Sequence, residues 1–273
     1  RTKNTGTAPC PVRRAHTSLF PISDVVGQPV GFGGRILPQV EHAQNAQNAS
    51  STNGQLPSNR PTRPLPKYIN SSDSLLYKKG TLLYGLAQAK TAIQSCGRVL
   101  VVEGYVDLLA LVQHGHTEAV AVLGTALTAE QLKLVRRFTR EVYFFFDGDE
   151  AGLRAASRSF PLCVEAEVRG WGIFLPEAED PDSFVRRHGR AALEELIAQA
   201  EPLEDFYFRR HTPPAGASAF ERAQAAREAM AVLKPMKDIV ARGALLNQIA
   251  QRFGVREEDL RRVDSPSQES QAS

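Results

Sequence analysis

Apolar runs alternate with segments of helical spacing between residues 98 and 175. Strands are expected where β-branched and aromatic residues follow one another without polar alternation, a pattern typical of parallel strands buried on both faces. Helices are expected where apolar residues recur at intervals of three and four. This alternation predicts an α/β fold with a parallel sheet, right-handed crossovers and helices on both faces. The expected strands are 98–102, 118–122, 141–146 and 168–175, and the expected helices are 106–114, 128–138 and 150–160. Thr128, with Gln131 three residues later, is expected to form a capping box at the start of the second of these helices.

The segments before residue 98 predict a smaller mixed α+β part. Two short strands joined by a turn at 24–28 are expected within 19–37, and helical spacing follows over 81–95. Between them, residues 38–64 are rich in Gln, Asn, Ala, Ser and Pro and hold almost no large apolar residue. Such a segment buries too little surface to offset its ordering entropy, so a disordered insertion is expected there.

Beyond residue 182 the spacing is wholly helical. Helical segments are expected near 190–200, 203–210, 218–232, 236–252 and 256–262. The chain therefore divides into a partial amino-terminal subdomain (1–95), an α/β domain (96–182), a helical subdomain (183–263) and a disordered tail (264–273).

Carboxylates follow two of the expected strands. Glu103 and Asp107 come after the strand 98–102, and Asp147 and Asp149 come after the strand 141–146. The carboxyl ends of such strands form the edge where open α/β sheets bind ligands. Clustered acids repel one another unless a cation lies between them, and carboxylates without His or Cys favour a hard ion such as Mg²⁺. The alternative is two ordinary strand-to-turn junctions, where Gly and Asp are common.

Composition and charge exclude only a few classes of protein. The 273 residues carry a formal charge of +3, and Cys10, Cys96 and Cys163 are too scattered for a disulfide framework or a zinc ribbon. No apolar run approaches the roughly 18–20 residues that span a bilayer. The chain starts with Arg1 and shows no signal peptide, so a fragment of a cytoplasmic protein is expected.

Short motifs add a resemblance to a known family. Glu103-Gly104 and Asp147-Gly148-Asp149 resemble the Toprim signature, which DNA primases, topoisomerases and some nucleases share. Several further segments resemble motifs of bacterial replicative DNA primases (DnaG-type), in matching order from about residue 20 to 189. They are FPI at 20–22, GFGGR at 31–35, PKYINS at 66–71, YKKG at 77–80 with LYGL at 83–86, EGYVD at 103–107 and EDPD at 179–182.

The resemblance implies DNA-templated synthesis of short RNA primers by two-metal nucleotidyl transfer. Glu103, Asp147 and Asp149 would be catalytic and would bind Mg²⁺ or Mn²⁺. Asp107, Asp180 and Asp182 would be further metal ligands. Asp107 is equally at home as an acid at a helix N-terminus, Asp182 as the N-cap of a short helix, and Glu179 is expected in solvent.

The same resemblance implies partners. Arg35, Lys67 and Lys79 would bind the single-stranded DNA template or ribonucleoside triphosphates, and Gly124-Thr125 would line the site or form a plain turn. The family has basic residues just before the FPI segment, and residues 12–18 depart from this pattern. The resemblance therefore does not decide whether this segment contacts the template or the nucleotide. The zinc-binding domain would precede this chain, and the domain that binds the replicative helicase would follow Asp264. A monomer acting near the bacterial nucleoid, away from membranes, is expected.

Three other readings stay open at this stage. A topoisomerase of the Toprim class would need a nucleophilic Tyr in a separate cleavage domain. A nuclease of the class that works beside an ATPase would be expected near a Walker A loop, and the chain has none. A chain that binds nucleic acid without making primers is the non-enzymatic alternative.

Overall fold

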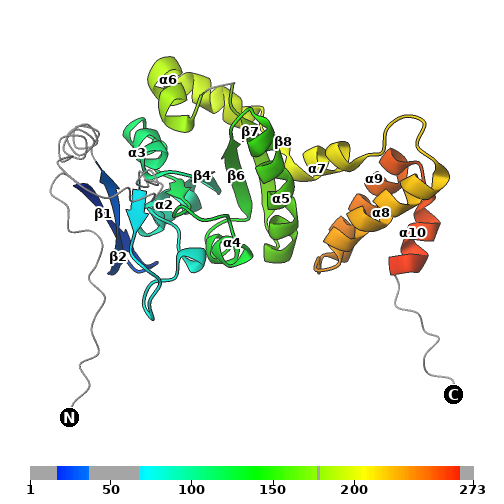
Figure 1. Ribbon diagram of the computed structural model, residues 1–273, viewed down its shortest axis with the longest axis horizontal. Coiled ribbons are helices and arrows are strands. Elements are labelled where there is room, and N and C mark those ends of the chain that lie inside the picture. The colour runs from blue at the N-terminus through cyan, green and yellow to red at the C-terminus, as the bar shows by residue number, and fades with distance from the viewer. Residues whose placement is uncertain (1–16, 37–67, 177–178, 265–273) are drawn as a thin grey trace, which may run out of the picture. The chain divides into compact units, whose positions relative to one another are not determined.

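The computed structural model describes residues 17–36, 68–176 and 179–264 (Figure 1). They fall into two compact units, one up to Lys79 and one from Gly80 onward. The predicted insertion at 38–64 and all but the first residue of the predicted tail lie outside the described residues. The finer division of the second unit at residues 95 and 182 stays a prediction.

The first unit contains a three-stranded antiparallel sheet. Strand β1 (Thr17–Ser23) pairs with β2 (Pro29–Ile36), and β2 pairs with β3 (Tyr68–Asn70). The predicted turn between β1 and β2 is confirmed. Its first residue, Asp24, accepts hydrogen bonds from the backbone N–H groups of Val26 and Gln28 at 3.0 and 2.9 Å.

A buried tyrosine explains one glycine of the segment 31–35. The Tyr77 side chain is only 1% exposed, and a Cβ on Gly31 would lie 3.3 Å from its ring. Burial, and then the negative charge of Asp73, raise the pKa of Tyr77 to about 12. Gly31 is therefore explained by close packing on an aromatic ring.

The second unit is built on a five-stranded sheet in the order β5-β4-β6-β7-β8 (Figure 1). All four predicted strands are present and parallel, while the two-residue β8 runs antiparallel to β7. No hydrophobic pattern marks so short a strand, so the prediction of helix alone beyond residue 182 was wrong there. The strands are β4 (Arg98–Val102), β5 (Ala119–Ala121), β6 (Glu141–Phe146), β7 (Arg169–Phe174) and β8 (Glu201–Pro202).

The α-helices match the predicted segments apart from their ends, while the short 3₁₀ helix η1 was not predicted. The first long helix starts at Leu86 and not at residue 81, because Gly85 takes a left-handed conformation with φ 84°. Thr128 and Gln131 form the expected capping box. The helices are η1 (Lys79–Thr81), α2 (Leu86–Cys96), α3 (Tyr105–Gln113), α4 (Ala129–Val135), α5 (Glu150–Ala166), α6 (Pro181–Ala198), α7 (Leu203–His211), α8 (Ala219–Leu233), α9 (Ile239–Phe253) and α10 (Glu257–Asp264).

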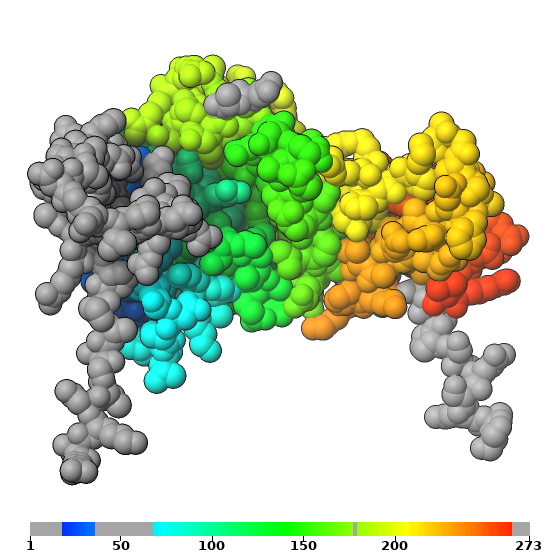
Figure 2. Space-filling view, in the orientation of Figure 1, coloured from blue at the N-terminus to red at the C-terminus, as the bar shows by residue number. Residues whose placement is uncertain are grey.

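Helices cover both faces of this sheet, as predicted. Leu100, Phe145 and Ile173 belong to one buried cluster with side chains of α3 and α6. The residues that alternate with them along the strands, such as Val101 and Phe144, face α5. In Figure 2 the outer surface of α5, in green, is turned toward the viewer. No helix of the described residues is long and apolar enough to cross a membrane.

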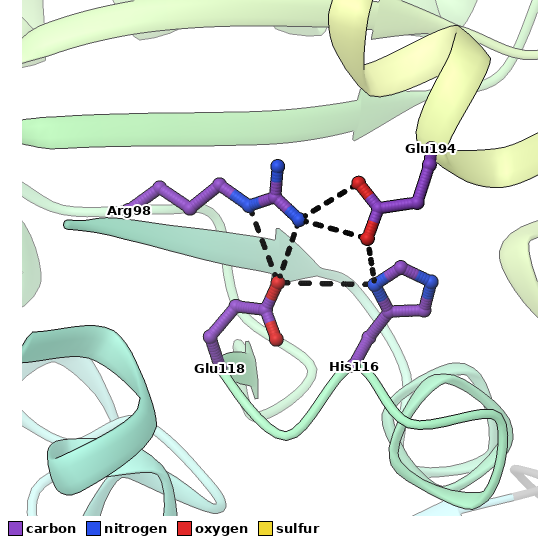
Figure 3. A network of polar contacts seen from close by, with 4 residues as sticks. All are labelled: Arg98, His116, Glu118 and Glu194. Carbon is purple, nitrogen blue, oxygen red and sulfur yellow. Dashed lines mark hydrogen bonds and ion pairs between the residues drawn. The ribbon is translucent and has the colours of Figure 1, made fainter. Parts of the chain in front are cut away.

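A buried polar network joins α6 to the edge of the sheet where the strands begin (Figure 3). Arg98, at the start of β4, donates hydrogen bonds to Glu118 and to Glu194 of α6 at distances of 3.0–3.2 Å. His116 is fully buried, with its Nδ1 3.8 Å from Glu118 and 3.6 Å from Glu194. Burial acts to raise the pKa of Glu118, but the neighbouring His116 and Arg98 outweigh it and lower that pKa to about 2.

Candidate active site

The topology creates a crevice between β4 and β6, of the kind in which open α/β sheets bind ligands. These strands are neighbours, but β4 leads into α3 on one face of the sheet and β6 leads into α5 on the other. Where successive connections take opposite faces, the carboxyl ends of the strands leave a crevice. Glu103 directly follows β4 and Asp147 directly follows β6. The fold therefore brings the two predicted strand-end acids to one crevice.

Burial and mutual repulsion raise the pKa values of the acids at this crevice. Burial raises the pKa of Glu103, and the negative charges of Asp147 and Asp149 raise it further. The pKa of Asp147 is raised by burial, then by Asp149 and Asp180. Such shifts are expected where carboxylates gather without a compensating cation. The four side chains thus share one electrostatic site.

Asp149 also has a structural task. It is the N-cap of α5, and its carboxylate accepts a hydrogen bond of 2.8 Å from the backbone N–H of Gly152. A Cβ on Gly152 would lie 2.0 Å from the carbonyl oxygen of Asp147. Gly152 therefore allows the 147–149 loop to fold onto the first turn of α5. Gly152 was not among the predicted site residues, although a Gly inside a helix, where it is unfavourable, was an available signal.

Asp107 lies in the first turn of α3 and faces a second group of acids. Its carboxylate is stabilised by the backbone N–H groups of Asp182 and Gly104. Burial raises the pKa of Asp107 to about 6, with further contributions from the charges of Asp180 and Asp182. Asp107 is therefore both an acid at a helix N-terminus and a neighbour of the candidate site. Since Asp180 also acts on Asp147, the two acid groups adjoin.

Two expectations for residues 179–182 were wrong. Asp180, not Asp182, is the N-cap of α6, and it forms a capping box with Ser183. Asp182 lies in the first turn and pairs with Arg186. The short helix expected after Asp182 is present, because Gly189 is non-helical (φ 78°) and divides α6 into a short first part and a second part near the expected 190–200. Glu179, expected in solvent, is only 8% exposed and pairs with Arg187 and His188.

A cavity of about 270 Å³ opens at this edge, lined by Asp147, Gly148, Asp149, Glu179 and Asp180. Its donors are all carboxylates, which fits a hard divalent cation and no soft one. Among the described residues, however, no three His, Cys, Asp or Glu side chains stand together in a position to hold a metal ion. The chemistry of the donors thus fits a metal, and the assignment of individual ligands stays a prediction.

The raised pKa of Asp107 gives a direct test of the repulsion among the acids of this site. The pKa of Asp107 is about 6 in the fold against an ordinary value of 3.8. Ionisation of Asp107 therefore destabilises the fold increasingly as pH rises between these two values, and the destabilisation is complete above the folded pKa. In metal-free buffer, Asp107→Asn should therefore stabilise the fold by roughly 1–3 kcal/mol at pH 8. At pH 3.5 the gain should vanish. Urea unfolding at both pH values measures it, and an equal gain at both would contradict the assignment.

The predicted basic residues lie in the first unit or outside the described residues. Arg35 is on β2, with its guanidinium carbon 5.5 Å from the centre of the Tyr68 ring. Lys79 begins η1, and its backbone N–H donates to Asp73 at 3.3 Å. Lys67 lies outside the described residues. Their role in binding nucleic acid stays a prediction.

Three family models match the chain. A Toprim-like model matches residues 100–185, a model of the N-terminal domain of the DNA primase catalytic core matches 15–90, and a model of the DnaB-helicase binding domain of primase matches 205–258. The last match corrects an expectation. We expected helicase-binding residues only beyond Asp264, and this model matches a segment that runs from α7 into the start of α10.

Curated relatives and solved structures agree with these models. The DNA primase of Pasteurella multocida is 38% identical over 247 residues, which are 89% of this chain and 38% of that protein. The DNA primase of Aquifex aeolicus is 39% identical over 68% of this chain and 32% of its own length. The chain thus spans about a third of the curated relatives that it matches.

The solved structures are primase domains. A DNA primase domain from Pseudomonas aeruginosa is 32% identical, with a TM-score of 0.75 over 92% of this chain and 73% of that one. The Escherichia coli primase catalytic core is 33% identical, with a TM-score of 0.75 over 89% of this chain and 72% of that one. These matches do not favour the topoisomerase and nuclease readings. The chain belongs to the family of bacterial, DnaG-type DNA primases.

Proposed function

We propose that the protein containing this chain makes short RNA primers on single-stranded DNA. The observation that carries the proposal is the set of electrostatically coupled acids Glu103, Asp147 and Asp149 at the crevice between β4 and β6. Crowded carboxylates raise one another's pKa, and this repulsion is relieved by binding the divalent cations that phosphoryl transfer uses.

In this reaction the 3′-hydroxyl of one ribonucleotide attacks the α-phosphate of the next, and pyrophosphate leaves. Glu103, Asp147 and Asp149 would hold Mg²⁺ or Mn²⁺, with Asp107, Asp180 and Asp182 as further candidates, and the metal would neutralise charge on the phosphates. As the alternative to holding a metal ion, Glu103 would act as the general base that accepts the proton of the attacking hydroxyl. Gly152 and the capping bond of Asp149 would keep Asp147 oriented.

The partners follow from the same proposal. A solved DnaG catalytic domain is described as bound to single-stranded DNA, and it is 32% identical to this chain. Arg35, Lys67 and Lys79 would contact the phosphates of a template or of a ribonucleoside triphosphate. The replicative helicase would bind the segment matched by the helicase-binding model, residues 205–258. A protein that makes primers on replicating DNA would act in the bacterial cytoplasm.

The salt dependence of DNA binding distinguishes residues that contact phosphates from the acids of the candidate site. Neutralising Arg35 and Lys79 together should weaken single-stranded DNA binding and reduce the salt slope by roughly 0.7 per lost contact. Asp147→Asn should leave DNA binding unchanged or tighter, because it removes negative charge. Fluorescence anisotropy with a labelled oligonucleotide over a salt series measures both. An unchanged slope in the double variant would remove these residues from the proposal.

A synthesis assay tests the proposed activity itself. The full-length protein, a single-stranded template, labelled ribonucleotides and Mg²⁺ should yield short RNA, and omitting the metal or the template should yield none. Tight binding of single-stranded DNA without any synthesis would favour a protein that only binds nucleic acid.

A further inference from the structure

A second cavity lies beside the candidate active site, inside the second unit. Its volume is about 530 Å³, and its walls come from β4, β6, α5 and the loop after β5. Most of the lining is apolar, and includes Val101, Phe144, Phe146, Leu127 and Leu162. Its lining includes the exposed residues Glu103, Gly124 and Arg158, so the cavity is open to solvent.

A few polar groups lie among the apolar walls. Glu103, the acid that follows β4, lines the cavity, which is therefore continuous with the candidate active site. Arg158 of α5 lines it too and is exposed, and within the described part of the chain its guanidinium has no ion-pair or hydrogen-bond partner. The Ser159 hydroxyl donates to the carbonyl of Ala155 at 2.9 Å, which leaves its lone pairs to accept. A mostly apolar cavity with few, convergent polar groups is the usual form of a small-molecule site.

The chemistry of this lining suits a flat, apolar ring with polar edges. A nucleobase offers an apolar face to Leu127 and the phenylalanine side chains, and oxygen and nitrogen acceptors at its edge for the donors of Arg158. The base of an incoming substrate is a poor candidate, because its hydrogen-bonding edge has to face the template base during copying. The cavity therefore suits a base that is not paired.

We propose that this cavity binds an unpaired nucleobase beside the catalytic carboxylates. The proposal rests on the proposed function for the presence of nucleic acid at this edge of the sheet. Two sources share the chemistry: a base of the single-stranded template next to the copied position, or the base of a free nucleotide. In either case Leu127 and the phenylalanine side chains would pack on the ring, and Arg158 would donate to its edge.

The test uses the 273-residue chain and two cavity variants. Leu127→Trp fills the cavity from its partly exposed mouth, and Arg158→Gln removes the guanidinium. Arg154→Gln is the matched control, one turn earlier on α5, where Arg154 pairs with Glu150 and does not line the cavity. Thermal melting confirms that each variant is folded. Because Arg158 is exposed, its variant keeps the test valid even if the tryptophan destabilises the fold.

Two probes distinguish the sources. Oligonucleotides with one abasic position, moved stepwise along the strand, should lose roughly five- to hundredfold in affinity at one position if a template base occupies the cavity. That loss should disappear in Leu127→Trp, while the salt slope stays unchanged. Adenosine and guanosine monophosphates, titrated without divalent ions, should instead bind the wild type and Arg154→Gln but neither cavity variant if the source is a free nucleotide.

The proposal is overturned if both cavity variants bind oligonucleotides and nucleotides as the wild type does. A wild type that binds no single-stranded DNA at all would count against the proposed function too. DNA binding that the cavity variants leave unchanged would count against this inference alone, so the two failures are distinguishable.

Discussion

Asp147→Asn is expected to abolish primer synthesis by the full-length protein. Asp147 is coupled to acids from two other segments, Glu103 and Asp180, so its carboxylate holds a central place in the site. Loss of a metal's charge stabilisation costs several kcal/mol, which corresponds to a fall of roughly a thousandfold or more in rate. Glu103→Gln should have a similar effect. The measurement is the yield of short RNA per unit time on a single-stranded template.

Thermal melting of the 273-residue chain gives a second readout, independent of activity. Mg²⁺ or Mn²⁺ at millimolar concentration should raise the melting temperature of the wild type, because an ion that binds only the folded state stabilises it. Asp147→Asn should remove that rise. Glu150→Gln is the control, since Glu150 is an exposed acid that follows Asp149 and pairs with Arg154 and Arg210. Full synthesis by Asp147→Asn, or a metal-dependent rise equal to that of the wild type, would contradict the assigned site.

Arg98→Met should destabilise the second unit by about 3–5 kcal/mol, because it leaves the buried carboxylate of Glu118 without its main partner. The Glu118 side chain is only 5% exposed, so solvent screens this interaction little. Adding Glu118→Leu to Arg98→Met should recover part of the loss, since an unpaired buried charge is then no longer present. Chemical unfolding at pH 7 measures both. Arg169→Met, which breaks an exposed pair with Glu141, should cost less than about 1 kcal/mol.

The same network predicts a response to acid. The pKa of Glu118 is about 2 in the fold against an ordinary value of 4.5. A lowered pKa contributes stability that is fully present above the ordinary value and is lost as pH falls through the folded value. The wild type should therefore lose stability between about pH 4.5 and pH 2, and Arg98→Met should lose less over that window. Equal acid dependence in the two proteins would show that Arg98 does not set the pKa of Glu118.

Local patterns in the sequence were sufficient for the parallel strands, the α-helices and the position of the crevice acids along the chain. Unbroken apolar runs predicted β4, β5, β6 and β7, and the capping box at Thr128 predicted the start of α4. The strand-end location of Glu103 and Asp147 was confirmed too. Each of these features depends on residues close together in sequence, where hydrophobic periodicity and capping chemistry act. The roles of the acids and of Arg35, Lys67 and Lys79 remain predictions from the motifs.

Only the tertiary structure decided the features that depend on distant residues. Buried Glu179 pairs with Arg187 and His188, which lie eight and nine positions later, and Arg98 meets Glu194, 96 positions later, because α6 packs on the sheet. The exclusion of a side chain at Gly152 depends on the loop that folds over it. No periodicity encodes such contacts, since burial and charge pairing are set by which elements pack together. The sequence by itself determined the elements and the acids, and packing determined which of those acids share a site and how strongly their charges interact.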